Sequence, residues 1–122
     1  MSLNFSMPVL VVNDHPTMVS IVSTVLKQIG FEHVDDARDT TAALKKLKCK
    51  NYGLVISDDK MTPLGGEDLL REIRANPRTA ATPFLLLTAN DAACNISEPC
   101  AKIAKPFNAK MLHSRIETIL AA

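Results

Sequence analysis

The sequence has few of the features that mark membrane, secreted or nucleic-acid-binding proteins. None of its apolar stretches approaches the roughly 20 residues needed to cross a bilayer. Met1–Ser6 contains no basic segment of the kind that begins a signal peptide. The 14 basic and 13 acidic residues leave a formal net charge of +1, which gives no electrostatic reason to expect nucleic acid or membrane partners. We therefore expect a cytoplasmic protein with no nucleic acid and no membrane partner.

Cysteine is also scarce, since the chain has three, at positions 49, 94 and 100. They form no Cys-x-x-Cys pair and no metal-ligand spacing with the three histidines, so free thiols are the expected state. A regulatory disulfide between Cys94 and Cys100, which lie in one loop, is an alternative. A chain of 122 residues is long enough for one core but too short for two. We expect a single domain over residues 1–122, with its core at about 7–121.

Short apolar runs alternate with helical patterns along the chain. Continuous apolar runs occur at Val9–Val12, Leu54–Ile56 and Phe84–Leu87, as expected of parallel strands that helices cover on both faces. The shorter and more polar His33–Ala37 fits an edge strand. Four helices are expected: one that begins near Pro16 and ends just before Gly30, one capped by Asp39 or Thr40, one over Glu67–Ala75 and one capped by Asn108. This alternation predicts an α/β fold with a parallel sheet.

Polar residues follow the apolar runs at four places. They are Asn13 with Asp14 after Val9–Val12, Asp58 after Leu54–Ser57, Thr88 after Phe84–Leu87, and Lys105 with Pro106 after Ile103 and Ala104. Because the carboxyl ends of neighbouring parallel strands meet at one crevice, we expect these residues to form one site. Carboxylates, a hydroxyl and an ammonium are the groups needed for Mg²⁺-dependent phosphoryl transfer to a carboxylate.

This set of motifs, in the order VLVVND, GLVISDDKM, FLLLTAN and AKPF, resembles the receiver domain of two-component response regulators, the CheY-like family. The resemblance runs from about Val9 to Leu120. It implies a flavodoxin-like (βα)5 fold, with a doubly wound five-stranded parallel sheet in the order 2-1-3-4-5. Only 16 residues lie between Thr88 and Lys105, and Asn95, Ser97 and Pro99 interrupt any helical pattern there. We therefore expect the fourth helix of the family, within Ala89–Ala101, to be shortened or irregular.

The resemblance also implies a role for each residue that takes part in phosphoryl transfer. Asp58 is implied as the phosphoacceptor, Thr88 as the switch hydroxyl that moves to the phosphoryl group, and Lys105 as the ammonium that pairs with Asp58 and then with its phosphate. In this family the peptide bond between Lys105 and Pro106 is cis, a form that proline makes accessible.

Mg²⁺ is the cofactor that the resemblance implies. Asp14, Asp58 and the main-chain carbonyl of Lys60 are implied as its direct ligands, with Asn13 acting through a water molecule. The family usually carries an acid at the position of Asn13, so one negative charge is missing, and we expect weaker metal binding. The side chain of Lys60 is free for another role, as a modulator of the phosphate's lifetime.

Two further departures from the family concern the switch. Lys102 stands where many members carry a Tyr or Phe that reports the movement of the hydroxyl. Thr62 with Pro63 and Gly65 with Gly66 replace the usual Met-Pro turn and acid-Gly pair after the phosphoacceptor. We expect partner choice to depend on surfaces other than an aromatic switch, such as the first and last helices.

The leading interpretation is a stand-alone receiver without an output domain, a regulatory protein rather than an enzyme. It would accept a phosphoryl group from a sensor histidine kinase or phosphotransfer protein and signal to an unknown downstream protein target. Asn13, Lys102 and the short segment 89–101 favour an alternative, a phosphorylation-independent pseudo-receiver adaptor. A small flavodoxin-like or aspartate-nucleophile enzyme is a remote alternative, because no glycine-rich loop follows Val12 and no second acid lies two residues after Asp58.

Overall fold

The computed structural model describes residues 5–61, 64–88, 100–104 and 107–121. Five strands form one parallel sheet in the order β2-β1-β3-β4-β5. The strands are β1 (Val9–Val12), β2 (Val34–Ala37), β3 (Leu54–Asp58), β4 (Phe84–Thr88) and β5 (Cys100–Ala104). The predicted strand order and the edge position of β2 are confirmed. Asp58 and Thr88, predicted to follow their strands, are the last residues of β3 and β4.

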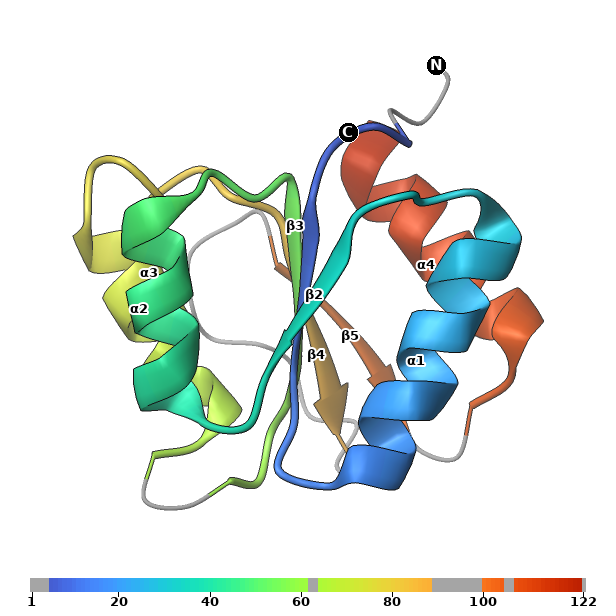
Figure 1. Cartoon of the computed structure of the whole chain (residues 1–122), viewed down its shortest axis with the longest axis horizontal. Coiled ribbons are helices and arrows are strands. Elements are labelled where there is room, and N and C mark those ends of the chain that lie inside the picture. The colour runs from blue at the N-terminus through green and yellow to red at the C-terminus, as the bar shows by residue number, and fades with distance from the viewer. Residues whose placement is uncertain (1–4, 62–63, 89–99, 105–106, 122) are drawn as a thin grey trace.

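Four helices pack on the sheet in the described parts of the chain. They are α1 (Pro16–Ile29), α2 (Thr40–Cys49), α3 (Gly66–Ala75) and α4 (Ala109–Ala121). α1 and α4 cover one face and α2 and α3 the other, which is the doubly wound arrangement (Figure 1). The predicted short or irregular helix between β4 and β5 falls mainly on residues 89–99, outside the described residues. Among the helices that are described, none is long and apolar enough to span a membrane.

The helix ends follow local signals in the sequence. α1 has proline at its start, and it ends before Gly30, whose φ of 132° is accessible to glycine but not to most other residues. Asp39 caps α2 by accepting a hydrogen bond from Ala42 N at 2.8 Å. Asn108 accepts one from Met111 N at 2.8 Å, at the start of α4. These contacts confirm the predicted caps of both helices.

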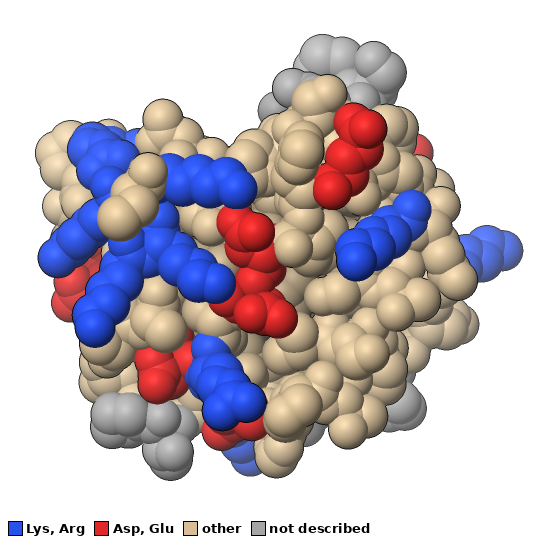
Figure 2. Space-filling view, viewed as in Figure 1, with Lys and Arg blue, Asp and Glu red and all other residues tan. Residues whose placement is uncertain are grey.

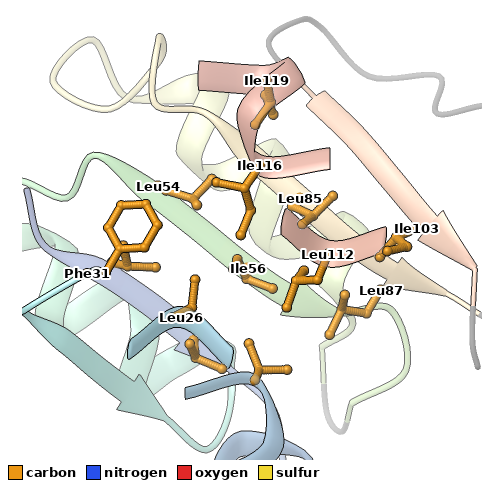
Figure 3. Packing of buried hydrophobic residues seen from close by; sticks show 13 residues of the cluster. Leu26, Phe31, Leu54, Ile56, Leu85, Leu87, Ile103, Leu112, Ile116 and Ile119 are labelled. Atoms are coloured by element: carbon orange, nitrogen blue, oxygen red, sulfur yellow. The ribbon is translucent and has the colours of Figure 1, made fainter. Parts of the chain in front are cut away.

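Two apolar layers, one on each face of the sheet, form the core. On the α1 and α4 side, Ile56 and Leu87 pack with Leu26, Leu112 and other residues of the cluster in Figure 3. The opposite layer joins β1, β3 and β4 to α2 and α3 and includes Leu86. Because successive side chains of a strand point to opposite faces, this alternation fixes the directions in which the last residues of β3 and β4 project.

The net charge is small but unevenly distributed. Lys and Arg gather over α2, where the exposed lysines of the helix and its C-cap lie, whereas acidic side chains run beside them along β2 (Figure 2). Two of these lysines bond to β2: Lys46 Nζ donates to the carbonyl of Asp36, and Lys50 Nζ donates to Asp35 Oδ2 at 2.9 Å. Two lysines of this basic surface, Lys46 and Lys50, therefore link α2 and its C-cap to the edge strand β2 by hydrogen bonds.

Asp35 on β2 is also bonded to Tyr52, whose hydroxyl donates to Asp35 Oδ2 at 2.6 Å. This bond, and then that of Lys50, hold the pKa of Asp35 below its ordinary value of 3.8. Burial, and then the same bond to Asp35, raise the pKa of Tyr52. The pair therefore favours a charged carboxylate and a neutral phenol.

We expect Tyr52→Phe to lower the free energy of unfolding by about 1 kcal/mol at pH 7, because a partly buried hydrogen bond is lost. A depressed pKa stabilises the fold above the unfolded value of 3.8, and this stabilisation is lost as pH falls through the lower folded pKa. The difference between the two proteins should therefore shrink below about pH 4. Urea unfolding followed by circular dichroism measures this difference at pH 7 and pH 3. An equal difference at the two pH values would contradict a lowered pKa of Asp35 caused by the bond to Tyr52.

Candidate functional site

Three of the predicted site residues lie together at the carboxyl edge of the sheet. Val12 pairs with Ser57 and Asp58 pairs with Leu87, so Asn13, Asp58 and Thr88 sit at the ends of three adjacent strands. Their exposed fractions are only 2%, 3% and 3%. The structure therefore places these three residues at neighbouring strand ends, with Asp58 on the middle strand.

Asp58 lies two residues after Ile56, so its side chain leaves β3 on the face that α1 and α4 cover. Asp14 follows β1 at the same edge, and its side chain is 35% exposed. Lys60, two residues after Asp58, is exposed. The buried Asp58 thus lies at the same edge of the sheet as the partly exposed Asp14. A charged ligand from solution can reach this edge.

Asn13 has a structural contact besides its predicted role near a metal. Its Oδ1 accepts a hydrogen bond from His15 N at 2.9 Å, which holds the turn that leads into α1. A carbonyl oxygen has two lone pairs, so this bond leaves one for a water molecule. His15 is highly exposed, with Nε2 3.6 Å from Asp14 Oδ1.

The donor set fits a hard cation such as Mg²⁺. Asp14 and Asp58 supply carboxylate oxygens, Asn13 supplies an amide oxygen, and the chain after Asp58 supplies main-chain carbonyls. Mg²⁺ keeps several waters and takes one or two carboxylates from a protein, so a pair of acids is sufficient. No cluster of three His, Cys, Asp or Glu side chains suited to a metal occurs in the described part of the chain. The donors named here are all oxygen atoms, whereas softer metals prefer nitrogen and sulfur ligands.

A hydrogen bond that the sequence did not predict joins Thr88 to Asp59. Thr88 Oγ1 donates to Asp59 Oδ2 at 2.6 Å. Thr88 lies two residues after Leu86, so both side chains lie on the face that α2 and α3 cover. The alternation along β3 predicts that Asp59 points away from Asp58, and the position of its partner agrees with this. The register could have suggested the contact, because Asp58 pairs with Leu87 and the next residues on each strand are Asp59 and Thr88.

Lys102 lies on β5 opposite Leu86, and its neighbour Ile103 packs in the α1 and α4 layer. Lys102 therefore projects to the same face as Thr88. Its Nζ is buried and has no hydrogen-bond partner among the described residues. The position where the family often carries an aromatic ring thus holds a buried ammonium. Lys105 and Pro106, with the predicted cis peptide bond, lie outside the described residues.

The loop after Asp58 passes close over the end of β3. Gly66 N donates to the carbonyl of Asp59 at 3.0 Å. A Cβ on Gly66 would lie 2.2 Å from the carbonyl oxygen of Asp58 and 2.7 Å from Leu86 Cδ1. No side chain larger than hydrogen fits there without moving the backbone of the site. Gly65 stands where the family usually carries an acid. The glycine that follows in the family pattern is retained as Gly66, which makes the close contact with Asp58.

A groove of about 370 Å³ runs beside the site between α1 and β2. Asn13, Asp14 and Arg38 line it where β1 and β2 end, and Lys27 of α1 contributes a second basic group. The acidic edge of the sheet is therefore accessible from the α1 side of the molecule.

Comparison with known proteins agrees with this fold. The chain matches the response regulator receiver domain family over residues 9–117. It is 35% identical over 118 residues to the chemotaxis protein CheY of Pseudomonas aeruginosa, with 93% of this chain and 95% of that protein covered. The solved structure of the chemotaxis response regulator CheY4 of Vibrio cholerae has a TM-score of 0.84 at 26% identity, covering 94% of this chain and 99% of that one.

A second solved structure shares the fold. It is the receiver domain of a sensor histidine kinase from Pseudomonas aeruginosa PAO1, described with a magnesium ion in its active site cleft, with a TM-score of 0.82 at 24% identity, covering 96% of this chain and 99% of that one. The fold and the residues at its carboxyl edge define a receiver-type regulatory domain. The chain belongs to the response regulator receiver domain family of two-component systems.

Proposed function

We propose that this receiver accepts a phosphoryl group on Asp58 from the phosphohistidine of a sensor histidine kinase or phosphotransfer protein. The observation that carries the proposal is the placement of Asp58 at the end of the central strand β3, between Asn13 on one side and Thr88 on the other. Similarity to CheY and to the receiver domain of a histidine kinase supports a kinase as the donor. The receiver then signals to a downstream protein through altered contacts.

The transfer is a displacement at phosphorus. A carboxylate oxygen of Asp58 forms the new P–O bond while the P–N bond to the donor imidazole breaks, and the imidazole leaves with the bonding electrons and takes a proton from water. Hydrolysis later reverses the modification, since water attacks phosphorus and the P–O bond to Asp58 breaks to release inorganic phosphate. The chain contributes mainly position and electrostatics, as is usual for phosphoryl transfer.

Asp14 and Asp58 would hold Mg²⁺, with the carbonyl of Lys60 and a water oriented by Asn13 completing the set. When bound, the ion offsets the negative charge that builds up where phosphate meets carboxylate. Asp58 is 97% buried, so it has little water of its own to do this. The ammonium of Lys105 is proposed to neutralise the remaining charge.

The function is tested by titrating Mg²⁺ and beryllofluoride, a mimic of the phosphoryl group, while amide NMR spectra are recorded. We expect shifts at Asp58 and Thr88 that need both ligands together. Asp58→Ala should remove them, whereas a variant of the exposed α2 lysine Lys45→Ala should keep them. Spectra that do not change would contradict phosphoacceptor function and favour the pseudo-receiver adaptor.

Asn13→Asp is expected to tighten Mg²⁺ binding. The new carboxylate can still accept the bond from His15 N, so the turn is kept while one negative charge is added near the metal. Solvent and contact through water keep the gain at about 1 kcal/mol, or about fivefold in Kd. Isothermal titration measures both proteins, with Asp14→Asn as the control that should weaken binding. Equal affinities would place Asn13 outside the field of the metal.

Lys60→Ala is expected to shorten the lifetime of the phosphate on Asp58. The long Lys60 stem lies two residues after the acceptor, where it can crowd the approach of water, and an ammonium cannot take a proton from that water. Release of inorganic phosphate at saturating Mg²⁺ should be a few times faster in the variant. Lys45→Ala is the matched control, since it removes another exposed lysine, on α2. Slower or unchanged loss of phosphate in Lys60→Ala would overturn the idea.

A further inference from the structure

The switch hydroxyl of Thr88 is already used in a contact directed away from Asp58. It donates to Asp59 Oδ2 at 2.6 Å, on the face that α2 and α3 cover. A hydroxyl has one proton, so it cannot donate to Asp59 and to a phosphoryl group at the same time. A phosphoryl group on Asp58 therefore competes with Asp59 for the proton of Thr88.

The surroundings of Asp59 make the release of Thr88 costly. Its other carboxylate oxygen, Oδ1, is buried and has no hydrogen-bond partner among the described residues. If Thr88 turned away, the partly buried carboxylate would lose a strong donor while its buried Oδ1 kept its desolvation cost. A short hydrogen bond to an ionised acceptor is also among the stronger polar contacts in proteins.

The backbone of Asp59 is held in place from two sides. Asp59 N donates to the carbonyl of Leu87 at 2.9 Å, which continues the pairing of β3 with β4. The carbonyl of Asp59 accepts from Gly66 N at 3.0 Å. The backbone that carries the acceptor is therefore held in place, and phosphorylation has to draw the Thr88 hydroxyl away from it.

We propose that Asp59 is a positioning residue that holds the Thr88 hydroxyl in the unphosphorylated arrangement, so that phosphorylation of Asp58 has to displace it. The inference rests on the proposed function of Asp58. It assigns to the residue beside the phosphoacceptor a control over how readily the domain switches. Removing the carboxylate of Asp59 should make the phosphorylated arrangement easier to reach, by roughly tenfold or more in affinity for a phosphoryl mimic.

A double-mutant cycle separates this effect from simple electrostatics. Beryllofluoride binding with Mg²⁺ is measured for the wild type, Asp59→Ala, Thr88→Val and the double variant. Loss of a negative charge beside Asp58 acts in both backgrounds and cancels in the comparison. We expect Asp59→Ala to tighten binding about tenfold more when Thr88 is present than when it is valine. An equal change in both backgrounds would overturn the proposal.

The nearly isosteric Asp59→Asn keeps an acceptor without the charge, and it guards against a folding defect in the alanine variant. Its affinity should fall between those of the wild type and Asp59→Ala. An Asp59→Asn protein that binds the mimic as tightly as Asp59→Ala would show that charge, and not the contact with Thr88, is responsible.

The unliganded protein provides a second readout that does not depend on phosphorylation. Three-bond NMR couplings report the χ1 rotamer of Thr88, which should be single in the wild type and averaged in Asp59→Ala. An unchanged rotamer would contradict the proposal whatever the binding result. If the wild type bound no beryllofluoride, the proposed function would fail, while the rotamer measurement would still decide whether Asp59 holds Thr88.

Discussion

Asp58→Ala is expected to abolish phosphorylation by acetyl phosphate or by a histidine kinase, whereas Asp59→Ala should leave it intact. The two acids are adjacent in the sequence but leave the sheet on opposite faces. Asp58 is level with Asn13 at the end of β1, and Asp14 follows Asn13 at the same edge of the sheet. Intact-mass spectrometry after incubation with the donor and Mg²⁺ measures the modification directly.

The same experiment tests the need for a metal. A chelator present during the incubation should prevent the modification of the wild type and of Asp59→Ala alike. Without the metal, the negative charges of the carboxylate and the phosphate are not neutralised. A phosphoryl group on Asp58→Ala, or equal modification with and without chelator, would contradict the assigned site.

Gly66→Ala is expected to lower the free energy of unfolding by about 1–3 kcal/mol, the usual cost of forcing an extra carbon into packed structure. The added Cβ would meet the carbonyl oxygen of Asp58 at 2.2 Å, and backbone cannot move aside as a flexible side chain can. Since that backbone carries Asp58 and Asp59, phosphorylation should also slow. Urea unfolding followed by circular dichroism measures the loss of stability.

Gly53→Ala is the matched control for this change. A Cβ there would also make close contacts, but they are with the side chain of Met7, which is flexible. We expect a smaller loss of stability than for Gly66→Ala, and phosphorylation at the rate of the wild type. If Gly66→Ala were as stable as the wild type, the loop after β3 would have more freedom than its close contacts indicate.

Local patterns were sufficient to predict most of the fold. The continuous apolar runs in β1, β3 and β4 mark strands buried on both faces, and Asp39 and Asn108 mark helix starts, because these signals depend on neighbouring residues alone. The order of the strands depends on contacts between distant segments. It came from the resemblance to the receiver family, which the comparisons confirm.

The site was predicted only in part, because some of its contacts depend on how distant segments pair. Strand ends converge in any parallel sheet, so the placement of Asn13, Asp58 and Thr88 at neighbouring strand ends followed from the strand assignments. The bond between Thr88 and Asp59 did not, because it depends on the register between β3 and β4, which no local pattern specifies. The roles of Lys105 and of the cis bond before Pro106 stay predictions, since both residues lie outside the described part of the chain.

Mapping the phosphoryl group within the chain tests the proposed chemistry most directly. Protein incubated with acetyl phosphate and Mg²⁺ is reduced with borohydride, which converts an aspartyl phosphate to homoserine, and the peptide containing both adjacent acids is sequenced by tandem mass spectrometry. We predict homoserine at position 58 alone, and none when a chelator is present. Homoserine at position 59, or none at either position, would contradict the assignment of Asp58 as the phosphoacceptor.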